Sequence, residues 1–152
     1  MSNTRELAKH VEENPGDHAQ RWRLAKKLYA ACEYRAALKH LRVLVQKWEP
    51  RANVWRYYAA AYYRLGRYDE SITQLSSAIK MWPDEVALLE QLARVQEAAG
   101  YRRQARDTWR HSEECQPKHP LAGAALKRLT APPADPADGT DQDTPLGDSD
   151  SG

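Results

Sequence analysis

The sequence has no phenylalanine, and only two of its 152 residues are cysteines, Cys32 and Cys115. Two cysteines cannot form the disulfide framework of a small secreted domain. Leucine, isoleucine and valine are scarce, with 15, 2 and 6 residues. The longest apolar run, residues 57–63, is much shorter than the roughly 18 residues that a membrane span requires. Residues 1–6 also lack the apolar core of a signal peptide. The sequence therefore predicts a cytoplasmic protein that does not cross a membrane.

Alanine and large aromatic residues take the place of the missing aliphatic ones. The chain has 23 Ala, 8 Tyr and 5 Trp. Alanine is the strongest helix former, and small residues beside aromatic rings favour close packing of helices. The formal net charge is only +2, so the scarcity of aliphatic residues does not indicate a disordered chain. We therefore expect an all-α protein.

Charge is distributed unevenly along the chain. Residues 131–152 carry six Asp and no Lys or Arg, and they are rich in Pro, Gly, Ser and Thr. Such a segment cannot bury enough apolar surface to offset the entropy lost on ordering, so we expect a disordered acidic tail. Residues 18–51 instead hold nine Lys or Arg against two Glu. One hypothesis is that the tail competes with an acidic ligand for this basic region; the alternative is that it only keeps the protein soluble.

The body of the chain repeats with a period of 34 residues. Small residues keep this spacing at two positions, and large apolar residues keep it at a third. The three sets are Ala25, Ala59 and Ala93; Ala37, Ser71 and Ala105; and Leu41, Leu75 and Trp109. Cys32, Gly66 and Gly100 keep the same spacing, and prolines follow at nearly the same interval. A repeat of this length is typical of a helical solenoid.

Each unit contains two helices joined by a turn. In the middle unit, Trp55, Tyr58 and Tyr62 recur at helical spacing. Gly66 follows them, and glycine adopts the positive φ that a tight turn requires. A second amphipathic helix comes next and ends before Pro83. The sequence therefore predicts a series of helical hairpins.

These hairpins resemble the tetratricopeptide repeat, whose pattern runs from Trp through Leu-Gly and Tyr to a later Ala, an aromatic residue and Pro. Residues 52–85 match it at Trp55, Tyr58, Ala59, Tyr62, Gly66, Tyr68, Ser71, Leu75, Ala78 and Pro83. Residues 86–119 match it with Gln96 and Arg102 in place of aromatics, and residues 18–51 match it with Cys32 in place of Gly. The resemblance implies an α-solenoid of helix-turn-helix repeats wound as a right-handed superhelix.

We expect residues 1–130 to form one domain with three repeats, over residues 18–51, 52–85 and 86–119. Residues 3–15 resemble the second helix of a half repeat, because Leu7 and Val11 lie 34 residues before Leu41 and Val45. A terminal repeat needs a cover for its apolar face. Residues 120–130 are expected to provide it as a capping helix, with the apolar stripe Leu121, Ala125, Leu126 and Leu129.

In the family that these repeats resemble, side chains of the first helices line a concave groove that holds a peptide or a partner helix. By that resemblance the groove residues here are Trp22, Lys26, Tyr29, Asn53, Arg56, Tyr63, Arg64 and Arg94. Aromatic residues and Arg contribute most of the binding energy at many interfaces. We therefore expect a partner protein with an acidic or amphipathic segment, and we place Trp22, Arg56 and Arg94 in a common trough. The alternative is that the tyrosines only pack between repeats and the basic side chains only face solvent.

Some members of that family bind the C-terminal carboxylate of a chaperone with Lys and Asn of the first repeat, Asn of the second, and Lys and Arg of the third. The matching positions here, in the same order, are Trp22, Lys26, Tyr57, Ala87 and Gln91, and none has the expected residue. We therefore do not expect this carboxylate clamp. Other small three-repeat members serve as secretion chaperones, which is an alternative to an adaptor or scaffold. Self-association through the unpaired N-terminal helix is a third hypothesis.

The sequence shows no Gly-rich phosphate loop and no nucleophile paired with a base, so we expect neither an enzyme nor a cofactor. His111, Cys115 and His119 are spaced four residues apart. However, Pro117 interrupts the helix before His119, and no fourth ligand is near in sequence. We therefore expect no metal site.

The basic first repeat offers a further alternative, weak binding of nucleic acid or another polyanion. Trp22 and Trp48 alternate there with Arg and Lys, a combination suited to single-stranded nucleic acid. Helical repeats that read RNA base by base use many more units. A protein partner is therefore the preferred interpretation.

Overall fold

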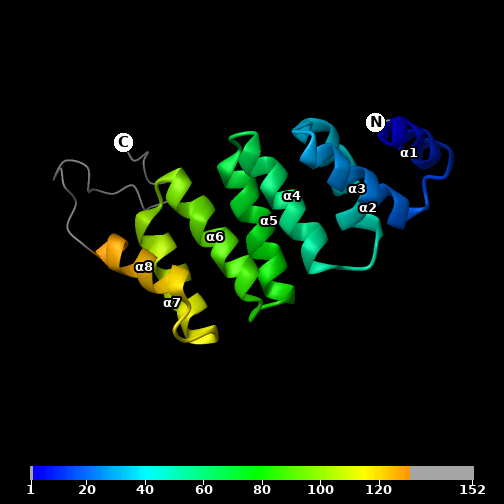
Figure 1. Ribbon diagram of the computed structural model, residues 1–152. Helices are drawn as coiled ribbons and strands as arrows, with labels where there is room; N and C mark the ends of the chain where they lie inside the picture. The colour runs from blue at the N-terminus through cyan, green and yellow to red at the C-terminus, as the bar shows by residue number, and fades with distance from the viewer. Residues whose placement is uncertain (1, 131–152) are drawn as a thin grey trace, which may run out of the picture. The chain divides into compact units, whose positions relative to one another are not determined.

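The computed structural model describes residues 2–130, and the regular structure of this segment is entirely α-helical (Figure 1). Its eight helices are α1 (Ser2–Glu13), α2 (His18–Ala30), α3 (Tyr34–Lys47), α4 (Ala52–Arg64), α5 (Tyr68–Met81), α6 (Val86–Ala99), α7 (Arg102–Cys115) and α8 (Pro120–Thr130). The all-α prediction is confirmed. The predicted acidic tail, residues 131–152, lies outside the described residues.

The described residues form two compact units, and the boundary between them falls between Gln74 and Leu75, within α5. Two helices fall within each predicted repeat. Helix α1 overlaps the predicted half repeat, residues 3–15, and α8 has the bounds of the predicted capping helix, residues 120–130. The repeat boundaries and the right-handed superhelix stay predictions. Across the described residues, none of the helices combines the length and the apolar composition that crossing a membrane would need.

The 34-residue period is present in the backbone. Cys32, Gly66 and Gly100 all have positive φ, at 63°, 77° and 89°. In each case the following residue donates its N–H to a carbonyl five residues earlier. These bonds are Glu33 to Leu28 at 2.9 Å, Arg67 to Tyr62 at 2.9 Å and Tyr101 to Gln96 at 2.8 Å. This pattern ends the first helix of each hairpin with a left-handed residue.

Cys32 is the one position of these three that lacks glycine, and a side chain in the left-handed region costs about 1–2 kcal/mol. We expect Cys32→Gly to raise the free energy of unfolding by about 1 kcal/mol. Conversely, Gly66→Ala is expected to lower it by about 1 kcal/mol through the backbone alone, because a Cβ at Gly66 would meet no atom within 4 Å. Urea denaturation followed by circular dichroism measures both changes. Cys32→Ala keeps the strained backbone, so an equal gain from that variant would contradict the explanation.

The repeated small and large residues form the core. All nine residues of the three sets that keep the 34-residue spacing are at most 2% exposed. Alanine at these positions lets the two helices of a hairpin approach closely. The hydroxyl of the buried Ser71 donates a 2.8 Å hydrogen bond to the carbonyl oxygen of Ala59. Its polar group is therefore satisfied within the core.

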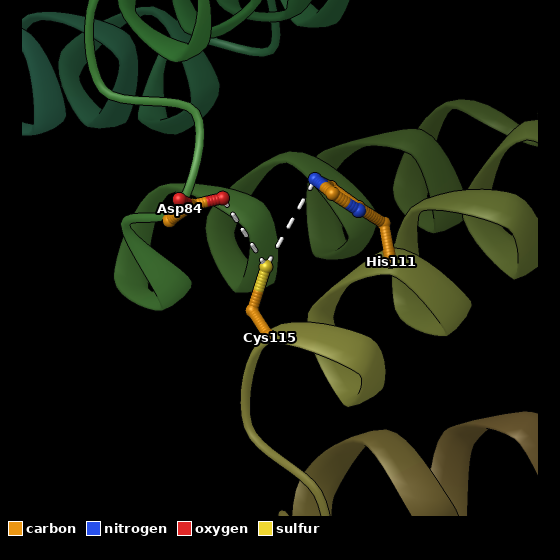
Figure 2. Close-up of side chains that lie close together, drawn as sticks. All are labelled: Asp84, His111 and Cys115. Atoms are coloured by element: carbon orange, nitrogen blue, oxygen red, sulfur yellow. Dashed lines mark hydrogen bonds between the residues drawn. The ribbon is translucent and has the colours of Figure 1, made fainter.

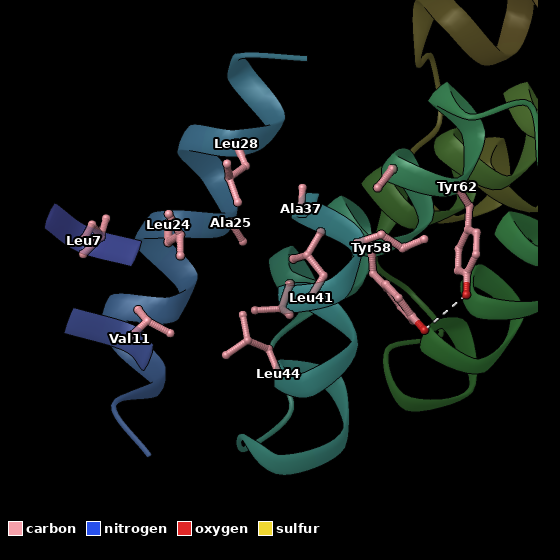
Figure 3. Close-up of a cluster of buried hydrophobic side chains, with 13 residues drawn as sticks. Leu7, Val11, Leu24, Ala25, Leu28, Ala37, Leu41, Leu44, Tyr58 and Tyr62 are labelled. Atoms are coloured by element: carbon pink, nitrogen blue, oxygen red, sulfur yellow. Dashed lines mark hydrogen bonds between the residues drawn. The ribbon is translucent and has the colours of Figure 1, made fainter. Parts of the chain in front are cut away.

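The core of the first unit extends into the N-terminal helix, as Figure 3 shows. Leu7 and Val11 of α1 belong to the same buried cluster as Leu24 of α2 and Leu41 of α3. Helix α1 also packs on α2. The isolated helix expected at the N-terminus is thus covered on its apolar side by the first repeat.

In the second unit, α8 packs on α7 through small residues. Ala122, Ala125 and Leu129 join Trp109 in one buried cluster. The predicted stripe was wrong at its first position, because Leu121 is 43% exposed and Ala122 is buried in its place. The residues Ala122, Ala125 and Leu129 lie on one helical face, and the alanines allow close approach to α7.

Candidate functional site

Four aromatic rings from three helices gather in the first unit. They are Trp22 and Tyr29 of α2, Tyr34 at the start of α3, and Tyr57 of α4, and we call them the aromatic cluster. The ring centroids of Trp22 and Tyr57 are 5.1 Å apart with an interplanar angle of 83°. Tyr29 lies 5.3 Å from Tyr57 and 5.1 Å from Tyr34. Edge-to-face contacts of this kind are favourable beyond the apolar area that they bury.

The helices fix the aromatic cluster in place. Trp22 and Tyr29 are seven residues apart, so both lie on one face of α2. Tyr57 reaches them because α4 packs against α2. Trp22, Tyr29 and Tyr57 are partly buried and rest against the core of the unit. The rings are therefore held without a ligand, which reduces the entropy that binding would cost.

Two cations are held against the aromatic cluster. The Lys26 Nζ lies 4.8 Å from the centre of the Trp22 ring. The Arg64 Nε donates a 3.3 Å hydrogen bond to the hydroxyl of Tyr29, and its guanidinium lies 6.0 Å from the centre of Tyr34. The hydrogen bond to Tyr29 raises the pKa of Arg64. Cations over aromatic faces are attracted by the ring quadrupole, so the cluster carries positive charge at its surface.

The two helices that supply most of this surface contain no acidic residue. Helix α2 has four Lys or Arg and helix α4 has two, and neither has Asp or Glu. No carboxylate of these helices neutralises Lys26 or Arg64. The positive charges on these two helices attract ligands of the opposite sign. The chemistry of this surface suits a segment that carries carboxylates beside apolar or aromatic side chains.

The remaining predicted groove residues lie outside the aromatic cluster, with Asn53, Arg56 and Tyr63 on α4 and Arg94 on α6. Arg56 donates a 3.2 Å hydrogen bond from Nη1 to Oδ1 of Asn53. Tyr63, which is 37% exposed, packs its ring 5.5 Å from that of Tyr68. Arg94 is an exposed residue of α6 in the second unit. The structure thus brings together Trp22, Lys26, Tyr29 and Arg64, whereas the common trough that includes Arg94 stays a prediction.

Sequence reasoning missed Tyr34 and Tyr57 as members of this surface. The 34-residue period maps Trp22 onto Arg56 and Tyr29 onto Tyr63. The ring that Trp22 contacts is instead Tyr57, one residue further along α4. The period identifies equivalent positions, but it does not say which side chain of one hairpin faces the next.

A second cluster, in the second unit, brings together Asp84, His111 and Cys115 (Figure 2). The Cys115 Sγ lies 3.8 Å from Oδ1 of Asp84 and 4.0 Å from Nε2 of His111. Burial and the neighbouring Asp84 carboxylate raise the pKa of the Cys115 thiol.

His119, the third candidate ligand in the sequence, lies apart from this cluster. It forms an ion pair with Glu90, and its Nδ1 accepts a 3.2 Å hydrogen bond from the backbone N–H of Leu121. The residue that joins His111 and Cys115 is instead Asp84, from the connection between α5 and α6. The spacing in the sequence grouped His119 with His111 and Cys115, whereas in the structure Asp84 takes the place of His119.

Comparison with known proteins agrees with the helical repeats. Residues 52–95 match the sequence profile of the tetratricopeptide repeat. No curated protein matches the chain. The solved structures that resemble it include PcrH from Pseudomonas aeruginosa, with 22% identity and a TM-score of 0.69 over 75% of this chain and 92% of that one. MamA shows 16% identity and a TM-score of 0.77 over 83% of this chain and 74% of that one.

A third similar structure is the type III secretion chaperone SycD of Yersinia enterocolitica, solved in complex with a peptide of the translocator YopD. It shows 19% identity and a TM-score of 0.68 over 73% of this chain and 90% of that one. At these identities the likeness concerns the fold. The chain has the all-α solenoid fold of helix-turn-helix repeats that the sequence predicted, and no enzyme family is indicated.

Proposed function

We propose that this tetratricopeptide-repeat chain is a non-catalytic interaction module that binds a segment of another protein on α2 and α4. The observation that carries the proposal is the aromatic cluster, held in place by the core and flanked by Lys26 and Arg64. The structure of SycD with a YopD peptide supports it, because a protein of the same fold binds a partner segment.

The chemistry of the surface defines the partner segment. Aromatic rings offer faces for apolar and aromatic side chains. Lys26 and Arg64 offer charges for carboxylates beside the aromatic cluster, and Arg56 adds a further positive charge on α4. We therefore expect an acidic, amphipathic segment, either extended or helical. We propose an adaptor or scaffold role in the cytoplasm for the module.

Capture from a cell extract tests this function. Proteins retained by the wild-type chain are identified by mass spectrometry and compared with those retained by a double variant, Trp22→Ala with Arg56→Glu. A matched control variant is Trp48→Ala with Arg51→Glu. In that pair the Arg51 guanidinium lies 4.3 Å from the centre of the Trp48 ring, outside the aromatic cluster. A partner that both variants lose equally would contradict the proposal.

The contribution of charge gives a further prediction. Raising the salt concentration from about 0.1 M to about 1 M shortens the Debye length from about 10 Å to about 3 Å. We expect the affinity for the captured partner to fall by about tenfold, mainly through a slower association rate. Surface plasmon resonance separates the two rates. An association rate that does not change with salt would show that the basic residues do not attract the partner.

The likeness to SycD favours a second candidate within the same class, a chaperone for a secreted client. A chaperone would keep soluble a client that aggregates alone, whereas an adaptor would bind a partner that is stable alone. Expressing the captured partner with and without this chain distinguishes them. A filter-binding assay with single-stranded nucleic acid tests the polyanion alternative, for which steep salt dependence is the expected signature.

A further inference from the structure

Asp84, His111 and Cys115 come together from two segments of the second unit. His111 and Cys115 are one helical turn apart near the end of α7, so both lie on the same face. Asp84 belongs to the connection between α5 and α6. Figure 2 shows the side chains of Asp84 and His111 both pointing toward the Cys115 sulfur. One nitrogen, one sulfur and one carboxylate oxygen all lie within 4.8 Å of one another.

We propose that Asp84, His111 and Cys115 bind a zinc ion, with water as the fourth ligand. Thiolate, imidazole and carboxylate are the three side-chain groups that zinc binds in proteins. The thiolate disfavours magnesium and calcium, which prefer oxygen ligands throughout. The ion would connect α7 to the chain segment before α6.

The observed distances are close to those of a tetrahedral zinc site. Zinc lies about 2.3 Å from sulfur and about 2.0–2.2 Å from nitrogen or oxygen, which places neighbouring ligand atoms about 3.5 Å apart. The sulfur lies 3.8 Å from the Asp84 oxygen and 4.0 Å from the His111 nitrogen. Asp84 is exposed, and the His111 side chain is 46% exposed. Because both side chains lie at the surface, they can rotate toward an ion and close the set, whose atoms lie within 4.8 Å of one another, to tetrahedral distances.

An exposed acidic residue, Glu114, lies beside the other ring nitrogen of His111. The Nδ1 of His111 lies 3.6 Å from Oε1 of Glu114, while its Nε2 faces Cys115. In many zinc sites a carboxylate at the second ring nitrogen orients the histidine ligand. His111 thus presents the correct nitrogen to the proposed ion.

The alternative is a set of hydrogen bonds without a metal. Without a metal, the Cys115 thiol donates to Oδ1 of Asp84, and its sulfur accepts from Nε2 of His111 when that nitrogen carries a hydrogen. Zinc satisfies all three groups at once, and its binding displaces the thiol proton. The two interpretations predict different behaviour toward a divalent metal.

Cobalt substitution distinguishes them, because Co²⁺ occupies zinc sites and absorbs visible light. We expect one equivalent of Co²⁺, added to the reduced full-length chain, to give the near-ultraviolet charge-transfer band of a thiolate–cobalt bond. Zinc is expected to abolish the band by displacement. Cys115→Ser should lose the band and Cys32→Ser should keep it. Absence of the band in the wild-type chain, or its persistence in Cys115→Ser, would overturn the proposal.

Glu114→Gln tests the geometry without removing a ligand. We expect it to weaken Co²⁺ binding by about tenfold or more, and His111→Gln to weaken it further, while circular dichroism shows that both variants stay helical. Saturating zinc should raise the Tm of the wild-type chain, because it binds the folded state. An equal rise in Cys115→Ser would contradict a site built on this thiolate.

Discussion

Replacing Trp22 with Ala and Arg56 with Glu together is expected to weaken the captured partner's binding by at least about 100-fold. Loss of the indole removes the edge-to-face contact with Tyr57 and the ring beneath Lys26. Glu at position 56 introduces the first carboxylate on the two helices that form this surface. Isothermal titration with the purified partner measures the affinity.

The double variant must remain folded for this result to count. Both residues are only partly buried, and neither belongs to the fully buried core. We expect its circular dichroism spectrum to match that of the wild-type chain. The control pair, Trp48→Ala with Arg51→Glu, removes the same residue types from the end of α3 and the start of α4. Wild-type affinity in the first double variant would exclude the α2 and α4 surface as the site.

Replacing Trp109 with Ala is expected to lower the free energy of unfolding by about 3–5 kcal/mol. Trp109 is 2% exposed and packs in one cluster with Ala93, Ala125 and Leu129. Its indole N–H also donates a 2.6 Å hydrogen bond to Oε2 of Glu97. The substitution therefore leaves a large cavity between α7 and α8 and removes a partner of a partly buried carboxylate. Urea denaturation followed by circular dichroism measures the loss.

The repeat itself supplies the control for this prediction. Leu41 and Leu75 occupy the equivalent position in the other two repeats, and both are fully buried. Trp109→Leu should therefore cost clearly less than Trp109→Ala, because leucine fills part of the cavity. Equal losses from the two variants would show that the hydrogen bond to Glu97, rather than packing, accounts for the effect.

The sequence predicted the fold because each hairpin buries the same positions. Ala25, Ala59 and Ala93 all have 0% exposure, and the period alone identified them. The same period placed Cys32 at a glycine position, where it has the left-handed backbone of Gly66. A repeated contact leaves a repeated residue type, so composition and spacing were sufficient.

Contacts that are not repeated could not be predicted in this way. Tyr57 meets Trp22 because of the way one hairpin faces the next, and Asp84 meets Cys115 across 31 residues. On α8, hydrophobicity favours Leu121 over Ala122 as the buried residue. The close approach of α7 instead favours the smaller side chain, and Ala122 is the one that is buried. Each of these depends on how particular helices pack, which occurs once in the chain.

Site-specific photocrosslinking tests the central claim most directly. A photoreactive phenylalanine analogue replaces Tyr63 on α4, which is 37% exposed, and in a matched control it replaces Leu121 on α8, which is 43% exposed. We predict that position 63 crosslinks to an acidic, amphipathic segment of the captured partner and that position 121 does not. A crosslink from position 121 with none from position 63 would contradict a binding site on α2 and α4.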